Sequence, residues 1–162
     1  MSDVLIDKSK KRIAFFDAVY MGLDQIHQSK HERRALIIIS DGAETNGQHK
    51  ESEIREYARK LDFQIFGIMK YDPGEPGASP NRVRNMVEIT GGRLLMPSGF
   101  MELDYYIDLV HAELQNQYLL CYIPTNNRHD GKLRKIRVKL DPPPKLPALT
   151  VHARKERYAP KN

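Results

Sequence analysis

Residues 34–42, with the sequence RALIIISDG, constrain the fold of this chain more than any other stretch. Residues 36–39 are four consecutive large aliphatics, a pattern typical of a strand buried on both faces in a parallel sheet under helices. Three of them are β-branched isoleucines, which favour strand over helix. The run ends in a polar turn at the carboxyl end of the strand, where open α/β sheets bind ligands. The candidate ligand-binding residues are therefore Ser40, Asp41 and Gly42.

Asp41 has two possible roles at this position. An aspartate that follows a strand commonly accepts hydrogen bonds from the backbone amides of its own loop and so builds the turn. The same carboxylate could instead contribute to a ligand or metal site. Position alone favours the turn-building role, and the sequence leaves both open.

Length and charge narrow the classes of protein. A chain of 162 residues is long enough for one domain with a proper core. Its longest apolar run is far shorter than the roughly 20 residues needed to span a bilayer, and its first residues lack a signal-peptide pattern. The single cysteine, Cys121, excludes an internal disulfide. The net charge of +5 comes from residues 128–157, which hold ten Lys or Arg and three acids.

Hydrophobic periodicity predicts alternating helices and strands followed by a β-rich tail. The three- and four-residue spacing of apolar positions predicts helices at 15–30, 52–61, 81–90 and 102–116. Apolar runs predict strands at 34–40, 63–69 and 93–96. Apolar runs and period-2 alternation predict further strands at 118–124, 134–140 and 149–158. The expected fold is α/β: a mostly parallel, Rossmann-like sheet in three layers with helices on both faces, plus C-terminal antiparallel strands.

Several motifs, taken together and in order, resemble the bacterial von Willebrand factor A-related (VWA) domain. They are FDAVY at 16–20, ALIIISDG at 35–42, EITGGR at 88–93, QYLLCYIP at 117–124, DGKLRKIR at 130–137 and YAP at 158–160. The resemblance extends from about residue 13 to residue 160. It implies a doubly wound α/β fold with a divalent cation above the sheet.

The resemblance also implies a metal-ion-dependent adhesion site, of which this chain carries one part. The family's site combines an Asp-x-Ser-x-Ser loop, a threonine on a second loop, and the aspartate of Ser-Asp-Gly, which corresponds to Asp41. The first loop has no counterpart here, and Lys11, Arg12 and Ile13 stand where the family commonly has Gly-Gly-Thr. A hard cation needs about six oxygen ligands. We therefore expect no tightly bound cofactor, and at most weak Mg²⁺ binding at Asp41.

The resemblance covers the C-terminal part of the family fold, because the N-terminal strands have no counterpart. We expect a lead-in at 1–12, a VWA-like domain at 13–117 and a β-strand extension at 118–160 packed on the same domain. The strand at 34–40 would then lack its usual neighbour, and an apolar edge strand is a template for pairing. Either residues 1–12 or another chain would cover it, so we expect self-association through this edge.

The resulting prediction is a non-enzymatic protein-binding module with a degenerate metal site and an unidentified protein partner, contacted near the loops after Asp41 and Met69. One alternative is a metal-assisted hydrolase that uses Asp17, Asp41 and Glu44. The other is a nucleic-acid binder that uses the basic residues near Arg134, which is less favoured because those charges alternate with aliphatics as on any exposed strand face. Members of the family are often exported, but the sequence leaves the compartment open.

Overall fold

The computed structural model describes residues 14–31, 34–69, 77–142, 144 and 149–159. In chain order, its elements are α1 (Phe15–Gln28), β1 (Ala35–Ile39), α2 (Glu51–Lys60), β2 (Gln64–Ile68), α3 (Pro80–Thr90), β3 (Leu94–Leu95), a 3₁₀ turn (Phe100–Glu102), α4 (Leu103–Gln115), β4 (Leu133–Lys135) and β5 (Glu156–Tyr158). The expected α/β class is confirmed. The lead-in at 1–12 and most of the loop after Met69 lie outside the described residues.

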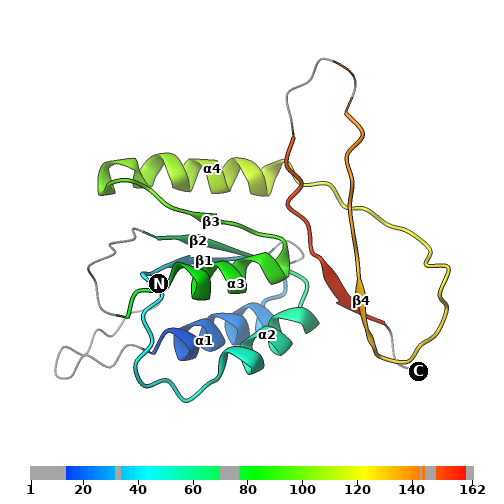
Figure 1. Ribbon diagram of the computed structural model, residues 1–162, viewed down its shortest axis with the longest axis horizontal. Coiled ribbons are helices and arrows are strands. Elements are labelled where there is room, and N and C mark those ends of the chain that lie inside the picture. The colour runs from blue at the N-terminus through cyan, green and yellow to red at the C-terminus, as the bar shows by residue number, and fades with distance from the viewer. Residues whose placement is uncertain (1–13, 32–33, 70–76, 143, 145–148, 160–162) are drawn as a thin grey trace.

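The main sheet has three parallel strands in the order β1-β2-β3. Ala35 pairs with Gln64 at one end of the β1–β2 ladder, and Ile39 pairs with Ile68 at the other. Within the described residues β1 is therefore an edge strand, and residues 1–12, which the sequence suggests as a possible cover, lie outside them. Figure 1 shows α1, α2 and α3 together on one face of this sheet and α4 on the other.

Two apolar clusters follow from the alternation of side chains along the strands. The larger cluster joins α1, α2 and α3 to the sheet through buried residues that include Leu23, Ile54, Ile65 and Val87. The smaller cluster lies under α4 and consists of Phe66, Ile68, Leu95 and Val110.

The sequence predicts a strand at 34–40 buried on both faces, and this prediction is wrong for one face. Ile38 points into the larger cluster and is buried, whereas Ile37 and Ile39 are 42% and 63% exposed. In the ladder these two residues pair with Phe66 and Ile68, which α4 covers. Helix α4 therefore shields β2 and β3 but leaves the outer strand open.

The junction between α3 and β3 locks against β2. Gly91 ends α3 with a φ of 83°, the left-handed conformation expected for the Gly-Gly pair. The buried hydroxyl of Thr90 donates to the carbonyl oxygen of Val87 at 3.0 Å. Its oxygen accepts from the backbone N–H of Ile65 at 2.8 Å. The end of the helix is thus tied to the backbone of the central strand.

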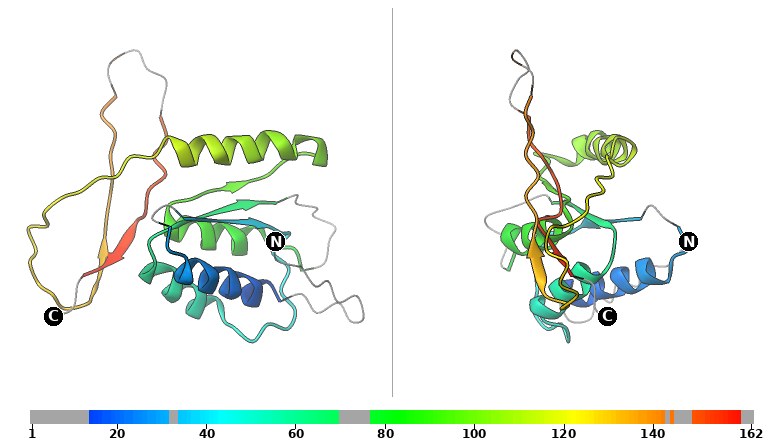
Figure 2. Two further views of the ribbon diagram at one scale, coloured as in Figure 1. Left: turned by 180° about the vertical axis from the view of Figure 1, so that it is seen from behind. Right: turned by 90° about the vertical axis from the view of Figure 1, so that its right-hand side faces the viewer.

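The C-terminal tail forms a small antiparallel sheet of β4 and β5, which confirms the expected antiparallel tail in part. The ladders are shorter than the predicted strands at 134–140 and 149–158. The strand predicted at 118–124 is wrong, because residues 117–124 have no regular secondary structure. An apolar run indicates a strand only where a sheet edge lies alongside it, and here the segment extends away from the body (Figure 2).

Arg154 attaches this tail to the α/β body. Its guanidinium donates to the carbonyl oxygens of Arg59 at 3.2 Å, Leu61 at 2.8 Å and Phe63 at 3.3 Å. Arg59 in turn pairs with Glu156 at 2.9 Å. The cation thus satisfies carbonyl groups left over where α2 ends. In the described part of the chain, no helix is long and apolar enough to cross a membrane.

Candidate functional site

In the turn after β1, the side chains of Ser40 and Asp41 accept hydrogen bonds from backbone amides two residues further along the chain. Oδ1 of Asp41 accepts from the backbone N–H of Ala43 at 2.9 Å, and Oγ of Ser40 accepts from the N–H of Gly42 at 3.0 Å. The backbone carbonyl of Asp41 accepts from the N–H of Ser79 at 3.0 Å. The Asp41 carboxylate thus makes a turn-building bond, the simpler of its two expected roles.

Gly42 is required by its surroundings. Its φ is 72°, and a Cβ at this position would stand 2.6 Å from the carbonyl oxygen of Ser79. The carbonyl of Gly42 accepts a hydrogen bond from the guanidinium of Arg82. The glycine therefore brings the turn against the start of α3, which is a structural role.

Glu44, the second acid of the hydrolase alternative, is also engaged with backbone amides. Its carboxylate accepts from the N–H groups of Phe16 at 3.0 Å, Asn46 at 3.1 Å and Gly47 at 2.6 Å. It joins the loop that follows β1 to the first turn of α1.

Asp17, the third acid, holds the other end of the same loop. Its carboxylate accepts from the N–H groups of Gln48 and His49 at 2.9 Å each, and Nδ1 of His49 lies 2.8 Å from Oδ1. The His49 ring stacks on Tyr20 with centroids 4.0 Å apart. Sequence reasoning missed His49, because nothing local marks a histidine 32 residues from its aspartate.

The three acids therefore share one kind of contact. Each carboxylate accepts hydrogen bonds from amides of the segment that follows β1, and nothing in these contacts joins the three into one site. Among the described residues, no group of three or more His, Cys, Asp or Glu side chains is arranged to hold a metal ion.

The contacts of Asp17 imply a measurable pH dependence. The amides of Gln48 and His49, and then the His49 side chain, hold the pKa of Asp17 below its ordinary value of 3.8. A depressed folded-state pKa contributes stability that is present above the unfolded-state pKa and is lost as pH falls through the folded-state value. We expect the stability advantage of the wild type over Asp17→Asn to be full at about pH 5 and to shrink below about pH 4.

Urea unfolding of both proteins at several pH values checks this result. The backbone amides are the largest cause of the shift, so the difference should persist in about 0.5 M salt, which screens exposed ion pairs. A difference that stays constant down to about pH 2 would contradict the assignment.

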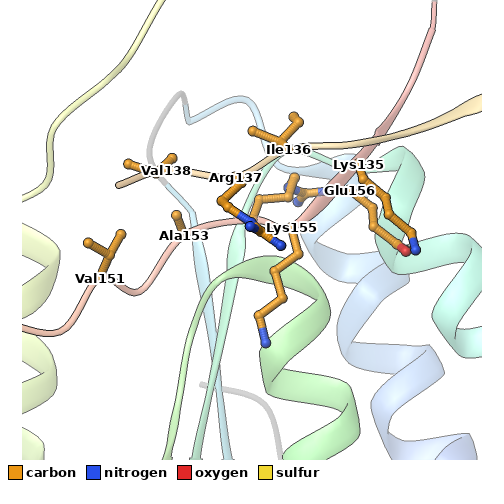
Figure 3. Close-up of a pocket in the computed structure, with 9 residues that line it drawn as sticks. Lys135, Ile136, Arg137, Val138, Val151, Ala153, Lys155 and Glu156 are labelled. Carbon is orange, nitrogen blue, oxygen red and sulfur yellow. The ribbon is translucent and has the colours of Figure 1, made fainter. Parts of the chain in front are cut away.

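Several basic residues of the tail form ion pairs with acidic residues of the same chain. Arg134 pairs with Asp130 at 2.8 Å, Lys155 with Glu88 at 3.2 Å and Arg157 with Asp62 at 3.3 Å. A hollow of about 500 Å³ lies between residues 135–138 and residues 151 and 153–156. Figure 3 shows the aliphatic and charged side chains that line it. The pairs of Lys155 and Arg157 join the tail to the α/β body, whereas the pair of Arg134 lies within the tail itself.

Two apolar surfaces distinguish the molecule more clearly than its charged groups. The first, which we call the open edge, consists of β1 with Ile37 and Ile39 exposed beside it. The second, the apolar segment, consists of residues 118–123, whose large apolar side chains are all exposed. The sequence predicts that the strand at 34–40 lacks its usual neighbour and is covered by residues 1–12 or by another chain, whereas it does not predict the exposure of the segment.

Comparisons of this chain with protein-family models, with curated proteins and with solved structures found no match. Functional inference therefore rests on the residues and their geometry.

Proposed function

We propose that this chain is a non-enzymatic protein-interaction module, a VWA-like three-layer α/β domain with a degenerate metal site. It binds an extended protein segment by strand addition at the open edge. The observation that supports this most directly is that Ile37 and Ile39 are 42% and 63% exposed on an edge strand of the described sheet.

The backbone of β1 also favours an extended protein segment as the partner. The N–H of Ser40 donates to Ile68, and the carbonyl of Arg34 accepts from Gln64, so alternate residues from 34 to 40 face β2. The N–H and C=O groups of Ala35, Ile37 and Ile39 therefore face outward, since a residue of a parallel strand directs both groups to one side. An extended peptide could bond these groups and cover both isoleucines, gaining about 1–2 kcal/mol for each.

The engagement of Asp17, Asp41 and Glu44 with backbone amides supports a non-enzymatic role over the hydrolase alternative. One oxygen of the Asp41 carboxylate accepts from Ala43, and the carboxylate by itself supplies far fewer than the roughly six oxygens that Mg²⁺ takes. We therefore expect millimolar Mg²⁺ or Mn²⁺ to leave the melting temperature within about 1 °C of its value in EDTA. A tightly bound metal at a hundredfold excess over its dissociation constant would instead add about 2.7 kcal/mol.

Thermal melts of the wild type and of Asp41→Ala, with each metal and with EDTA, measure this. A metal-dependent rise that disappears in Asp41→Ala, together with turnover of a phosphoester substrate, would favour the hydrolase and overturn the proposal.

Selection of displayed extended peptides on the immobilised protein tests the binding role. We expect enrichment of peptides with alternating apolar residues, whose affinity falls at least about tenfold on the double variant Ile37→Lys/Ile39→Lys. The matched control is Met21→Lys, which also charges an exposed apolar side chain, 69% accessible, but on α1. No enrichment, or equal affinity for wild type and double variant, would contradict the proposal.

A further inference from the structure

The apolar segment resembles a strand that lacks a sheet. Its side chains alternate so that Tyr118, Leu120 and Tyr122 would share one face of a strand and Leu119, Cys121 and Ile123 the other. Both faces are thus apolar, which is typical of a strand inside a sheet covered on both sides. In the structure, however, its large side chains lie 66–93% exposed.

The open edge, in turn, lacks a neighbouring strand on its outer side within the described residues. It presents outward-facing backbone groups at Ala35, Ile37 and Ile39, and no strand of the described sheet pairs with them. Strand β1 has five residues and the apolar segment has six, so the two are similar in length. One strand placed at this edge would bond those backbone groups and cover the two exposed isoleucines.

The topology of the fold directs the apolar segment to this edge. Helices α2 and α3 cross on one face and move the chain stepwise from β1 to β3. Helix α4 crosses on the opposite face, so a right-handed connection through it moves the chain back past β2, to the outer side of β1. The side chain of Gln117 already bonds Gln64, at the start of β2 and beside Ala35. The segment thus begins one strand away from the edge that it would complete.

We infer that the open edge binds the apolar segment of a second copy of this chain, as a fourth strand parallel to β1, in a reciprocal strand-exchanged dimer. This inference rests on the proposed strand-binding function and names its partner. Exchange of identical elements is a low-cost route to a dimer, because it makes between copies the contacts that the fold specifies within one.

The second copy is favoured over the chain's own segment by the conformation described. Residues 117–124 already extend away from their own sheet, and the chain beyond them returns to the tail that Arg154 attaches near the end of α2 (Figure 2). The open edge of a second copy can bind the segment without a change in the segment's position. Pairing within one chain would require the segment to turn back along β1 and the following loop to cross the sheet again.

Two double variants separate the halves of the interface. The edge variant, Ile37→Lys/Ile39→Lys, charges β1 and leaves the segment intact. The segment variant, Leu119→Lys/Leu120→Lys, charges one residue on each face of the segment, at side chains 89% and 66% exposed. Exposed sites leave both variants folded, which far-ultraviolet circular dichroism and melting curves check. The full chain and both variants are then measured alone and mixed, by light scattering after size exclusion at about 5–200 μM.

We expect the wild type to dimerise and each variant alone to raise the dissociation constant at least about a hundredfold. We expect the mixture to form a heterodimer, because the edge variant supplies an intact segment and the segment variant an intact edge. A disulfide or cross-link between Cys121 of the edge variant and a cysteine introduced at Ile37 of the segment variant should then join the two unlike chains.

Each other outcome overturns the inference in a recognisable way. A segment variant that still dimerises indicates pairing between two open edges, and an edge variant that still dimerises indicates pairing between segments. If the wild type stays monomeric at about 200 μM, the top of the measured range, a second copy of the chain is not the partner of the open edge. If displayed peptides still bind that monomer at Ile37 and Ile39, strand binding stands and only its partner is wrong.

Discussion

Replacing Gly92 with alanine is expected to lower the free energy of unfolding by about 3 kcal/mol or more, the upper range for overpacking a core. A Cβ at this position would stand 1.8 Å from the carbonyl oxygen and 2.8 Å from the carbonyl carbon of Ile65. Both atoms belong to the backbone of β2, so the contact cannot be relieved by rotating a side chain. The strand or the turn before β3 must move, and with it the Thr90 bond to the same residue.

A series of glycine substitutions gives the matched controls. Gly99→Ala should be nearly neutral, because no heavy atom beyond its two chain neighbours lies within 4 Å of the added methyl group. Gly67→Ala should fall between the two, since its closest neighbours are side-chain atoms of Val83 and Leu94 at 2.8 and 3.0 Å. Urea unfolding of the three variants measures the order. A stability of Gly92→Ala within about 1 kcal/mol of Gly99→Ala would contradict the close approach.

The helices and parallel strands could be predicted because their signal is local. The spacing of Val19, Leu23 and Ile26 indicates one buried helix face, and the structure buries all three. The same is true of α3, where Ser79 accepts from the N–H of Arg82 and Gly91 ends the helix. Each feature depends on residues within a few positions of one another.

The failures of prediction all depend on what lies beside a segment in space. The run at 118–124 has the composition of a strand, but a strand needs a neighbour that composition cannot supply. The exposure of Ile37 and Ile39 depends on where α4 packs, about 70 positions further along the chain. At the candidate site, the position of Asp41 was predictable, whereas its bond to Ala43 and the pairing of Asp17 with His49 required the folded loop.

Arg154 is a further residue that the sequence does not distinguish, and its replacement carries the second large expected effect. We expect Arg154→Met to lower the free energy of unfolding by about 2–3 kcal/mol, the usual contribution of hydrogen bonds to a charged group. Methionine retains much of the aliphatic bulk but cannot donate to the carbonyls of Arg59, Leu61 and Phe63. Burial lowers the pKa of the guanidinium from its ordinary value, so the cation depends on these acceptors for its compensation.

Lys155→Met is the matched control, because it removes the cation of the next residue, also just before β5. Lys155 is paired with Glu88 on the surface, where both side chains are largely exposed, and such pairs contribute about 0–1 kcal/mol. Arg154→Met should also speed proteolytic cleavage between residues 124 and 159, because the tail loses its attachment at the end of α2, whereas Lys155→Met should not. Equal stability and equal cleavage in the two variants would contradict the role assigned to Arg154 and leave its attachment role to the other tail contacts, such as the ion pairs Arg59–Glu156 and Arg157–Asp62.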